Sequence, residues 1–213
     1  MSTFEPSISG WSVVVAGYWN PRIFSALWVT TRLGASNQIA FEVPMDPGLP
    51  LRLAFDGVHL AITSDQMILT VDRAEDALVE RCLQLAMRAL QELPNTPTKA
   101  VGVNFAFVAT PPGRDLLSAF DIKDNNAISD AGIRIQSTTI QRTLLDGDQV
   151  VNFSLSNSDD GKVLLGFNFH KDTPTAQAAL AFLEAQPTGF KQRATEIIGK
   201  IYGAAAEDPG LNV

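Results

Sequence analysis

The chain has 213 residues, of which 46% are hydrophobic and 18% charged, a balance that predicts a folded globular protein and excludes a disordered one. Its net charge of −7 is spread along the sequence, because residues 1–98 contain 6 Lys/Arg and 10 Asp/Glu and residues 99–213 contain 10 and 13. Negative charge without a basic run repels phosphate backbones and anionic lipid, so nucleic acid and membrane surfaces are disfavoured as partners.

The first half of the chain predicts a strand, a helix, four strands and a long helix. β-branched and aromatic residues predict the first strand at 12–19, and Asn20-Pro21 is a typical helix start. Gly34 is placed to end this helix. Short strands are then expected at 38–43, 51–55, 58–63 and 67–71, with Asp56-Gly57 as a two-residue hairpin turn. An apolar stripe predicts a helix over 72–93, capped by Asp72.

The second half repeats this order of elements. We expect a strand at 100–108, a short helix at 114–120, a polar surface loop at 121–130 and a long strand at 133–145. Asp146-Gly147 turns the chain into strands at 149–155 and 163–169. A helical region from Thr173 to Tyr202, split near Pro187, and a flexible tail at 204–213 complete the chain.

The spacing of turn residues indicates an internal duplication. Pro21 and Asp56 are 35 residues apart, as are Pro111 and Asp146, so the two halves match at an offset of 90 residues. We therefore divide the chain into a β-α-β-β-β-β-α half at 1–98 and a β-α-β-β-β-α half at 99–203. The predicted fold class is α+β, with a mainly antiparallel sheet backed by long helices.

This order of elements resembles that of the TATA-box-binding-protein fold and of its helix-grip relatives. The resemblance covers most of the chain at the level of element order and includes no motif residue. It implies an antiparallel sheet with long helices on one side. The acidic composition argues against a DNA-binding saddle, and a fold resemblance carries no function.

No motif predicts catalysis, a cofactor or a metal, and we assign no residue to these roles. The two histidines, His59 and His170, lie in separate strands, which is not the pattern of a histidine-rich zinc site. The single cysteine, Cys82, lies among apolar residues and is predicted to be buried. The sequence shows no secretory signal and no apolar run near 18 residues, so we expect a cytoplasmic protein without a membrane-spanning helix. Frequent alanine with few lysines is typical of a bacterial source.

The sequence favours a non-enzymatic protein that binds a protein partner or forms homo-oligomers, such as an antitoxin, an immunity-type regulator or an assembly partner. Trp19, at the end of the first strand, is expected to be an exposed anchor. The loop at 121–130 is expected to supply an acidic rim for a basic partner and to lie near Trp19. Its candidate contact residues are Asp121, Asp124, Asn125, Asn126 and Asp130. The alternative is a small-ligand-binding protein or an enzyme with a pocket between the sheet and the helices.

Overall fold

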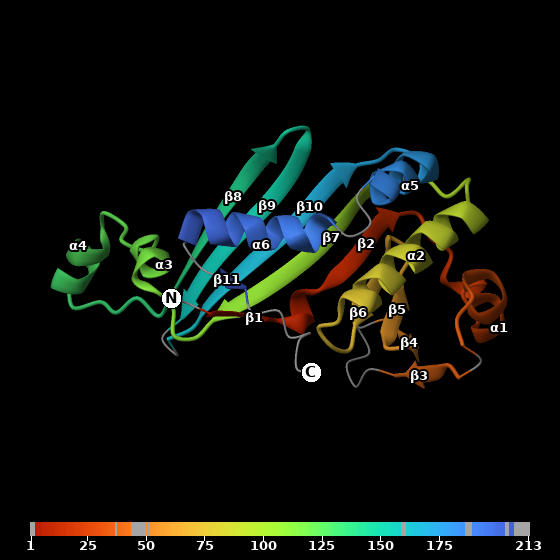
Figure 1. Ribbon diagram of the computed structural model, residues 1–213, viewed down its shortest axis with the longest axis horizontal. Coiled ribbons are helices and arrows are strands. Elements are labelled where there is room, and N and C mark those ends of the chain that lie inside the picture. The colour runs from red at the N-terminus through yellow and green to blue at the C-terminus, as the bar shows by residue number, and fades with distance from the viewer. Residues whose placement is uncertain are drawn as a thin grey trace.

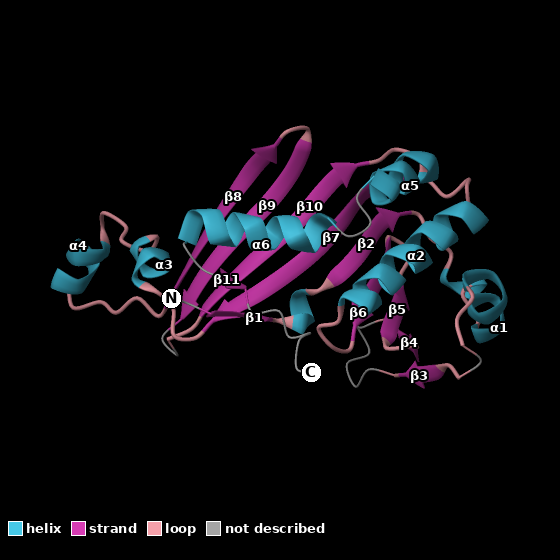
Figure 2. Ribbon diagram, viewed as in Figure 1, coloured by secondary structure: helices cyan, strands magenta, loops and turns pink. Residues whose placement is uncertain are grey.

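A computed structural model describes residues 3–36, 38–43, 50, 52–158, 161–185, 189–202 and 205–206. The described residues form an α+β fold in which one large sheet is covered by helices on one face (Figures 1 and 2). The predicted class, a mainly antiparallel sheet backed by long helices, is confirmed.

The sheet is a continuous array with β2 and β7 at its centre. Nine strands follow the order β3-β4-β5-β6-β2-β7-β10-β9-β8, and every neighbouring pair in it is antiparallel. The bounds are β2 Ser12–Gly17, β3 Ala40–Glu42, β4 Arg52–Phe55, β5 Val58–Ile62, β6 Gln66–Val71, β7 Thr98–Ala109, β8 Ser137–Asp146, β9 Gln149–Ser158 and β10 Val163–Asp172. Two short strands, β1 (Thr3–Pro6) and β11 (Ala205–Ala206), lie off this path, where β1 pairs with both β7 and β11.

Strand alternation separates a core face from the opposite face. Val13 and Val15 of β2 are buried, whereas their neighbours Ser12 and Val14 are half-buried. The same period of two places large apolar residues of the neighbouring strands on the core face. These are Met67, Leu69, Val101, Val103, Phe105, Phe107, Phe153, Leu155, Phe167 and Phe169.

Three longer helices cover the core face: α2 (Asp76–Glu92), α5 (Ala176–Ala185) and α6 (Gly189–Tyr202), which lie in front of the sheet in Figure 1. Each buries one stripe of side chains at helical spacing, as an amphipathic helix does. In α2 this stripe includes Leu78, Leu85 and Ala89.

Short helical segments connect these elements. After β2 the chain forms η2 (Pro21–Ile23), α1 (Ala26–Trp28) and η3 (Val29–Leu33), and Gly34 ends η3 in the left-handed conformation, with φ of 68°. After β7 it forms α3 (Arg114–Ser118) and α4 (Asn125–Asp130), which lie beyond the end of the sheet in Figure 1. A further turn, η1 (Ile8–Gly10), precedes β2.

Several predicted boundaries were wrong. The long helix begins at Asp76 rather than Asp72, because the backbone N–H of Asp72 bonds to Gly57 and closes the end of the hairpin. The edge strand begins at Ser137 rather than Ile133, and the expected loop at 121–130 contains α4. Within the tail expected at 204–213, Ala205 and Ala206 form β11, which pairs with β1, and the other residues lie outside the described part of the chain. Pro187, where the last helical region was predicted to split into two helices, lies outside the described residues.

Candidate functional site

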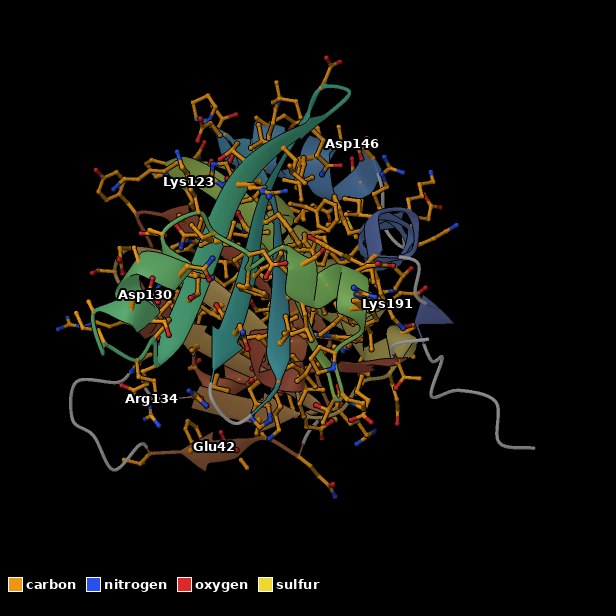
Figure 3. The ribbon with its side chains drawn as sticks, turned by 90° about the vertical axis from the view of Figure 1, so that its left-hand side faces the viewer. Glu42, Lys123, Asp130, Arg134, Asp146 and Lys191 are labelled. Atoms are coloured by element: carbon orange, nitrogen blue, oxygen red, sulfur yellow. The ribbon has the colours of Figure 1, made fainter. Side chains whose placement is uncertain are left out.

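The sheet face that turns away from α2, α5 and α6 is the open face. In Figure 3, α6 and Lys191 lie to one side of the strands, and Lys123, Asp130 and Arg134 lie to the other. The open face therefore has the α3–α4 segment at one end, while its middle presents the outward residues of β9, β10, β7 and β2.

A row of polar side chains crosses the open face at right angles to the strands. The register places its members directly opposite one another, each on the next strand of the sheet. We call this set the amide row: Thr143 of β8, Asn152 of β9, Asn168 of β10, Asn104 of β7 and Ser12 of β2.

A continuous chain of hydrogen bonds joins the amide row, and every donor points toward β2. The Thr143 hydroxyl donates to Asn152 Oδ1 at 3.2 Å, and Asn152 Nδ2 donates to Asn168 Oδ1 at 3.0 Å. Asn168 Nδ2 then donates to Asn104 Oδ1 at 2.6 Å, and Asn104 Nδ2 donates to the Ser12 hydroxyl at 2.9 Å. The row is thus one hydrogen-bonded unit assembled from five strands.

Glycines in the strands make room for polar groups on this face. A Cβ at Gly102 of β7 would lie 2.6 Å from Asn168 Nδ2, and a Cβ at Gly166 of β10 would lie 2.5 Å from Ser154 Oγ. Glycine weakens a strand interior, so its use at both positions indicates that the space is needed for these side chains.

The amide row keeps unused hydrogen-bonding capacity toward solvent. A carboxamide carries two N–H donors and an oxygen with two lone pairs. Within the row, Asn152, Asn168 and Asn104 each donate once and accept once, so each has one further N–H and one further lone pair. Neighbouring strands are about 4.8 Å apart, so the face offers evenly spaced donor and acceptor groups.

Charged groups lie at the borders of the open face. His170 Nε2 is 3.1 Å from Asp172 Oδ1 at one end of β10, and His59 Nδ1 is 3.1 Å from Glu42 Oε2 near the β3 edge. Glu42 also lies directly opposite Arg52. The amide row between these borders is uncharged, although the protein carries a net charge of −7.

Trp19 does not have the exposed position that the sequence suggested. Its side chain is 5% exposed, packs edge-on against Phe24 and donates from Nε1 to the Val15 carbonyl at 2.9 Å. The expectation of an exposed anchor was wrong, because the segment from Pro21 to Gly34 folds back against α2 and covers the ring. Arg88 of α2 donates to the Arg32 carbonyl there, at 2.9 Å.

The acidic segment is exposed but lies far from Trp19. Asp121, Asp124, Asn126 and Asp130 are exposed, and Asn125 is half-buried with its amide donating to the Phe120 carbonyl at 2.8 Å. Residues 121–130 follow the Ala109 end of β7, whereas Trp19 follows Gly17, which lies opposite Thr98 at the other end of β7. Because β2 and β7 are antiparallel, equivalent strand ends lie at opposite ends of the sheet, and the structure does not bring the two segments together.

Sequence reasoning missed the amide row, although the sequence carries a signal for it. Asparagine is depleted in strands, yet Asn104, Asn152 and Asn168 each stand within a strand and each precedes a phenylalanine. In each Asn-Phe pair the phenylalanine faces the core and the asparagine the open face.

One small cavity lies between the sheet and the helices. It is lined by residues of β2, α2 and β7, among them Val79, Cys82 and Phe105, and has a volume of about 10 Å³, room for one water molecule at most. Burial raises the pKa of the Cys82 thiol to about 12, so this cysteine is not a reactive thiolate at neutral pH.

No family model matches the chain, and no curated protein matches it in sequence. Within the described part of the chain, no helix is long and apolar enough to cross a membrane. In the same part, no three His, Cys, Asp or Glu side chains gather as a metal site would require.

Proposed function

We propose that this chain is a cytoplasmic, non-enzymatic binding protein, a regulator or assembly partner, and that a partner protein docks on the open face. The observation that carries the proposal is the amide row. Its side chains bond to one another across five strands, are uncharged, and retain a donor and an acceptor on each of three carboxamides.

The chemistry of the row favours a partner surface of peptide or side-chain amides and hydroxyls. Such groups pair with asparagine in both directions, whereas an isolated charge would lose hydration on an uncharged surface. The α3–α4 segment stands at the end of the open face, and its exposed carboxylates are Asp121, Asp124 and Asp130. They supply an acidic flank that favours a basic rim on the partner and speeds its association.

We also propose that the fold is an internal duplication, in the manner of the TATA-box-binding-protein or helix-grip element order. Val13 and Val103, which are equivalent at the offset of 90 residues, lie directly opposite each other on β2 and β7, where a twofold axis would pass. From this centre the strands run outward as β6, β5, β4 on one side and as β10, β9, β8 on the other.

The two Asp-Gly hairpins support the same symmetry. Asp56, between β4 and β5, has its Oδ2 3.3 Å from Arg81 Nη2 of α2. Asp146, the last residue of β8, accepts two hydrogen bonds from Arg193 of α6, at 2.5 and 2.6 Å. In each half the hairpin aspartate is thus tied to an arginine of a covering helix.

The binding role is tested by quantitative affinity capture from cells of the source organism with matched baits. Asn152→Lys adds a charge at an exposed position in the amide row, and Gln192→Lys adds the same charge at an exposed position of α6, on the opposite side. We expect wild type and Gln192→Lys to retain the same partner and Asn152→Lys to lose it, with similar melting curves for all three. Equal capture by both variants, or no reproducible partner for wild type, would contradict the proposal.

A further inference from the structure

The last strand of the sheet, β8, has an unpaired edge. Within the described residues β8 bonds to β9 alone, and in Figure 1 no described strand lies along its other edge. Unpaired edges are templates for strand addition, and proteins usually protect them with proline, lysine, bulges or short length. The ten residues of β8 include no proline or lysine, and its register with β9 is regular from Ser137 to Asp146.

β8 carries two charged residues, Arg142 near its middle and Asp146 at its end. Asp146 is held inward by Arg193, which leaves Arg142 as the other charged residue of the strand. Gln141, Thr139 and Thr143 present uncharged polar side chains on the open face, and Leu145 is 79% exposed at the end. A strand with one such charge can pair with a copy of itself when the register keeps the two Arg142 side chains from lying opposite each other.

Symmetry restricts how two copies of β8 can pair. Suppose that two copies of β8 pair as antiparallel neighbours about a twofold axis normal to the sheet. Directly opposed residues then point to the same face of the joined sheet. The axis therefore passes between one residue and the same residue of the second copy. An axis at Arg142 would set two guanidinium groups opposite each other, which is unfavourable. An axis at Ile140 shortens the overlap, whereas an axis at Gln141 pairs residues 137–145 of both copies without opposing like charges.

The Gln141 axis also extends the amide row. It places Thr143 opposite Thr139 of the second copy, and Thr139 already bonds to the Ser156 hydroxyl at 3.1 Å. The Thr143 hydroxyl donates to Asn152, so its oxygen remains able to accept a hydrogen bond from that threonine. The polar row of one copy then continues onto the open face of the other.

We propose that β8 is a homodimerisation edge, at which a second copy of this chain adds its β8 antiparallel about a twofold axis at Gln141 and makes one sheet through both molecules. This inference is independent of the proposed function, because a dimer joined at β8 covers neither Asn152 nor Asn168 and makes the open face wider.

Sedimentation velocity of full-length wild type, Gln141→Lys, Gln141→Glu and Gln192→Lys over a range of concentrations tests the dimer. At a twofold axis residue 141 faces itself, so we expect each charged variant to dimerise at least about tenfold more weakly than wild type. An equimolar mixture of Gln141→Lys and Gln141→Glu should regain dimerisation, because opposite charges then face each other. Gln192→Lys should behave as wild type.

Disulfide trapping provides a second readout. Gln141→Cys should form a covalent dimer under mild oxidation, since directly opposed residues of antiparallel strands have Cβ atoms about 5 Å apart. The proposal is overturned if the wild-type protein stays monomeric. This includes the case in which it stays monomeric and binds an unrelated extended peptide at β8. A dimer that the Gln141 variants leave unchanged also overturns it, as does a failure of the mixed variants to associate.

Discussion

At the scale of single residues, the open face depends on pairs of a glycine and a polar residue. In each pair the polar side chain fills the space that a Cβ on the glycine would occupy. Gly102 and Asn168 form such a pair, since the missing Cβ of the glycine is what allows the carboxamide to lie over β7. The same holds for Gly166 and Ser154 on the next strands. The hydrogen-bonded row is therefore set by glycine positions as much as by the asparagines.

Gly102→Ala should separate binding from stability. The new Cβ displaces the Asn168 carboxamide and breaks the row, while alanine recovers about 0.5–1 kcal/mol of the stability that glycine loses in a strand. A lost hydrogen bond costs about 1 kcal/mol, so the free energy of unfolding should change by less than about 1 kcal/mol. We expect partner capture to fall as strongly as in Asn152→Lys. Urea unfolding and affinity capture measure the two effects, and intact capture would show that the row is not the recognition surface.

The two hairpin aspartates should make stability depend on pH in acid. The hydrogen bond from Arg193 lowers the pKa of Asp146 from its ordinary value. Burial acts in the opposite direction on Asp56 and raises its pKa, but hydrogen bonds from Ser36 and Arg81 outweigh it, so the pKa is again lower than its ordinary value. A lowered folded-state pKa means that each ion pair stabilises the protein above the unfolded-state pKa, about 3.9, and that this contribution disappears as pH falls through the folded-state value.

Asp56→Asn and Asp146→Asn should each lower stability at pH 7 by about 1 kcal/mol, and each should flatten the loss of stability below about pH 4. Asp148→Asn, at an exposed position beside Gly147, is the control and should have little effect. Denaturant midpoints from pH 2 to 7 give the comparison. Similar effects of the first two substitutions would support equivalent hairpins, and an effect of one alone would count against the proposed duplication.

At the scale of elements, local sequence patterns located most strands and helices but not their partners. The hairpin at Asp56-Gly57 was predicted because both residue types tolerate positive φ, and both adopt it there, 51° and 76°. The second turn lies one residue later than predicted, at Gly147-Asp148, because Asp146 still pairs with Gln149. The stripe of Leu78, Cys82 and Leu85 was predicted because helical periodicity marks a buried face. Both signals lie within a few neighbouring residues.

Other features required information that no local pattern contains. Trp19 is buried by a segment whose short η2, α1 and η3 turns are held against α2 by contacts distant in sequence, such as the hydrogen bond from Arg88. The amide row joins Ser12 to Asn104 and Asn104 to Asn168, and it exists only when the strand order and the register are both fixed. One Asn in a strand predicts nothing, and three become a site only after the sheet is assembled.

Leu85→Ala tests the packing of α2 on the sheet. Leu85 is 1% exposed, and truncation of a buried leucine costs about 2–5 kcal/mol through lost burial and the cavity left behind. Leu27→Ala is the control, because Leu27 is 74% exposed and its truncation should change the free energy of unfolding by less than about 0.5 kcal/mol. Equilibrium unfolding in urea measures both. Equal effects of the two substitutions would show that α2 does not cover the core.

At the scale of the whole molecule, the two halves share one sheet and one core. The seam between them is the pairing of β2 with β7, and the core residues Val13 and Val103 meet across it. A chain of residues 1–98 alone would lack β7 and leave one edge of β2 unpaired beside an incomplete core.

We therefore expect full-length protein to unfold in one cooperative transition and residues 1–98 to show none. Calorimetry of the full chain and circular dichroism of the truncated chain measure this. Two separate transitions in the full chain, or a sharp thermal transition for residues 1–98, would mean that each half folds as an independent domain.

The central pairing of β2 with β7 also determines when the protein can fold during synthesis. Ser12 lies opposite Asn104, so the ribosome must extend the chain by 92 residues after Ser12 before this contact can form. Contacts between residues so distant in sequence slow folding, and an unpaired strand edge is prone to aggregation in the meantime. Until β7 emerges from the ribosome, the edge of β2 that pairs with β7 stays unpaired in the nascent first half. We therefore expect chaperones to bind the first half during this time.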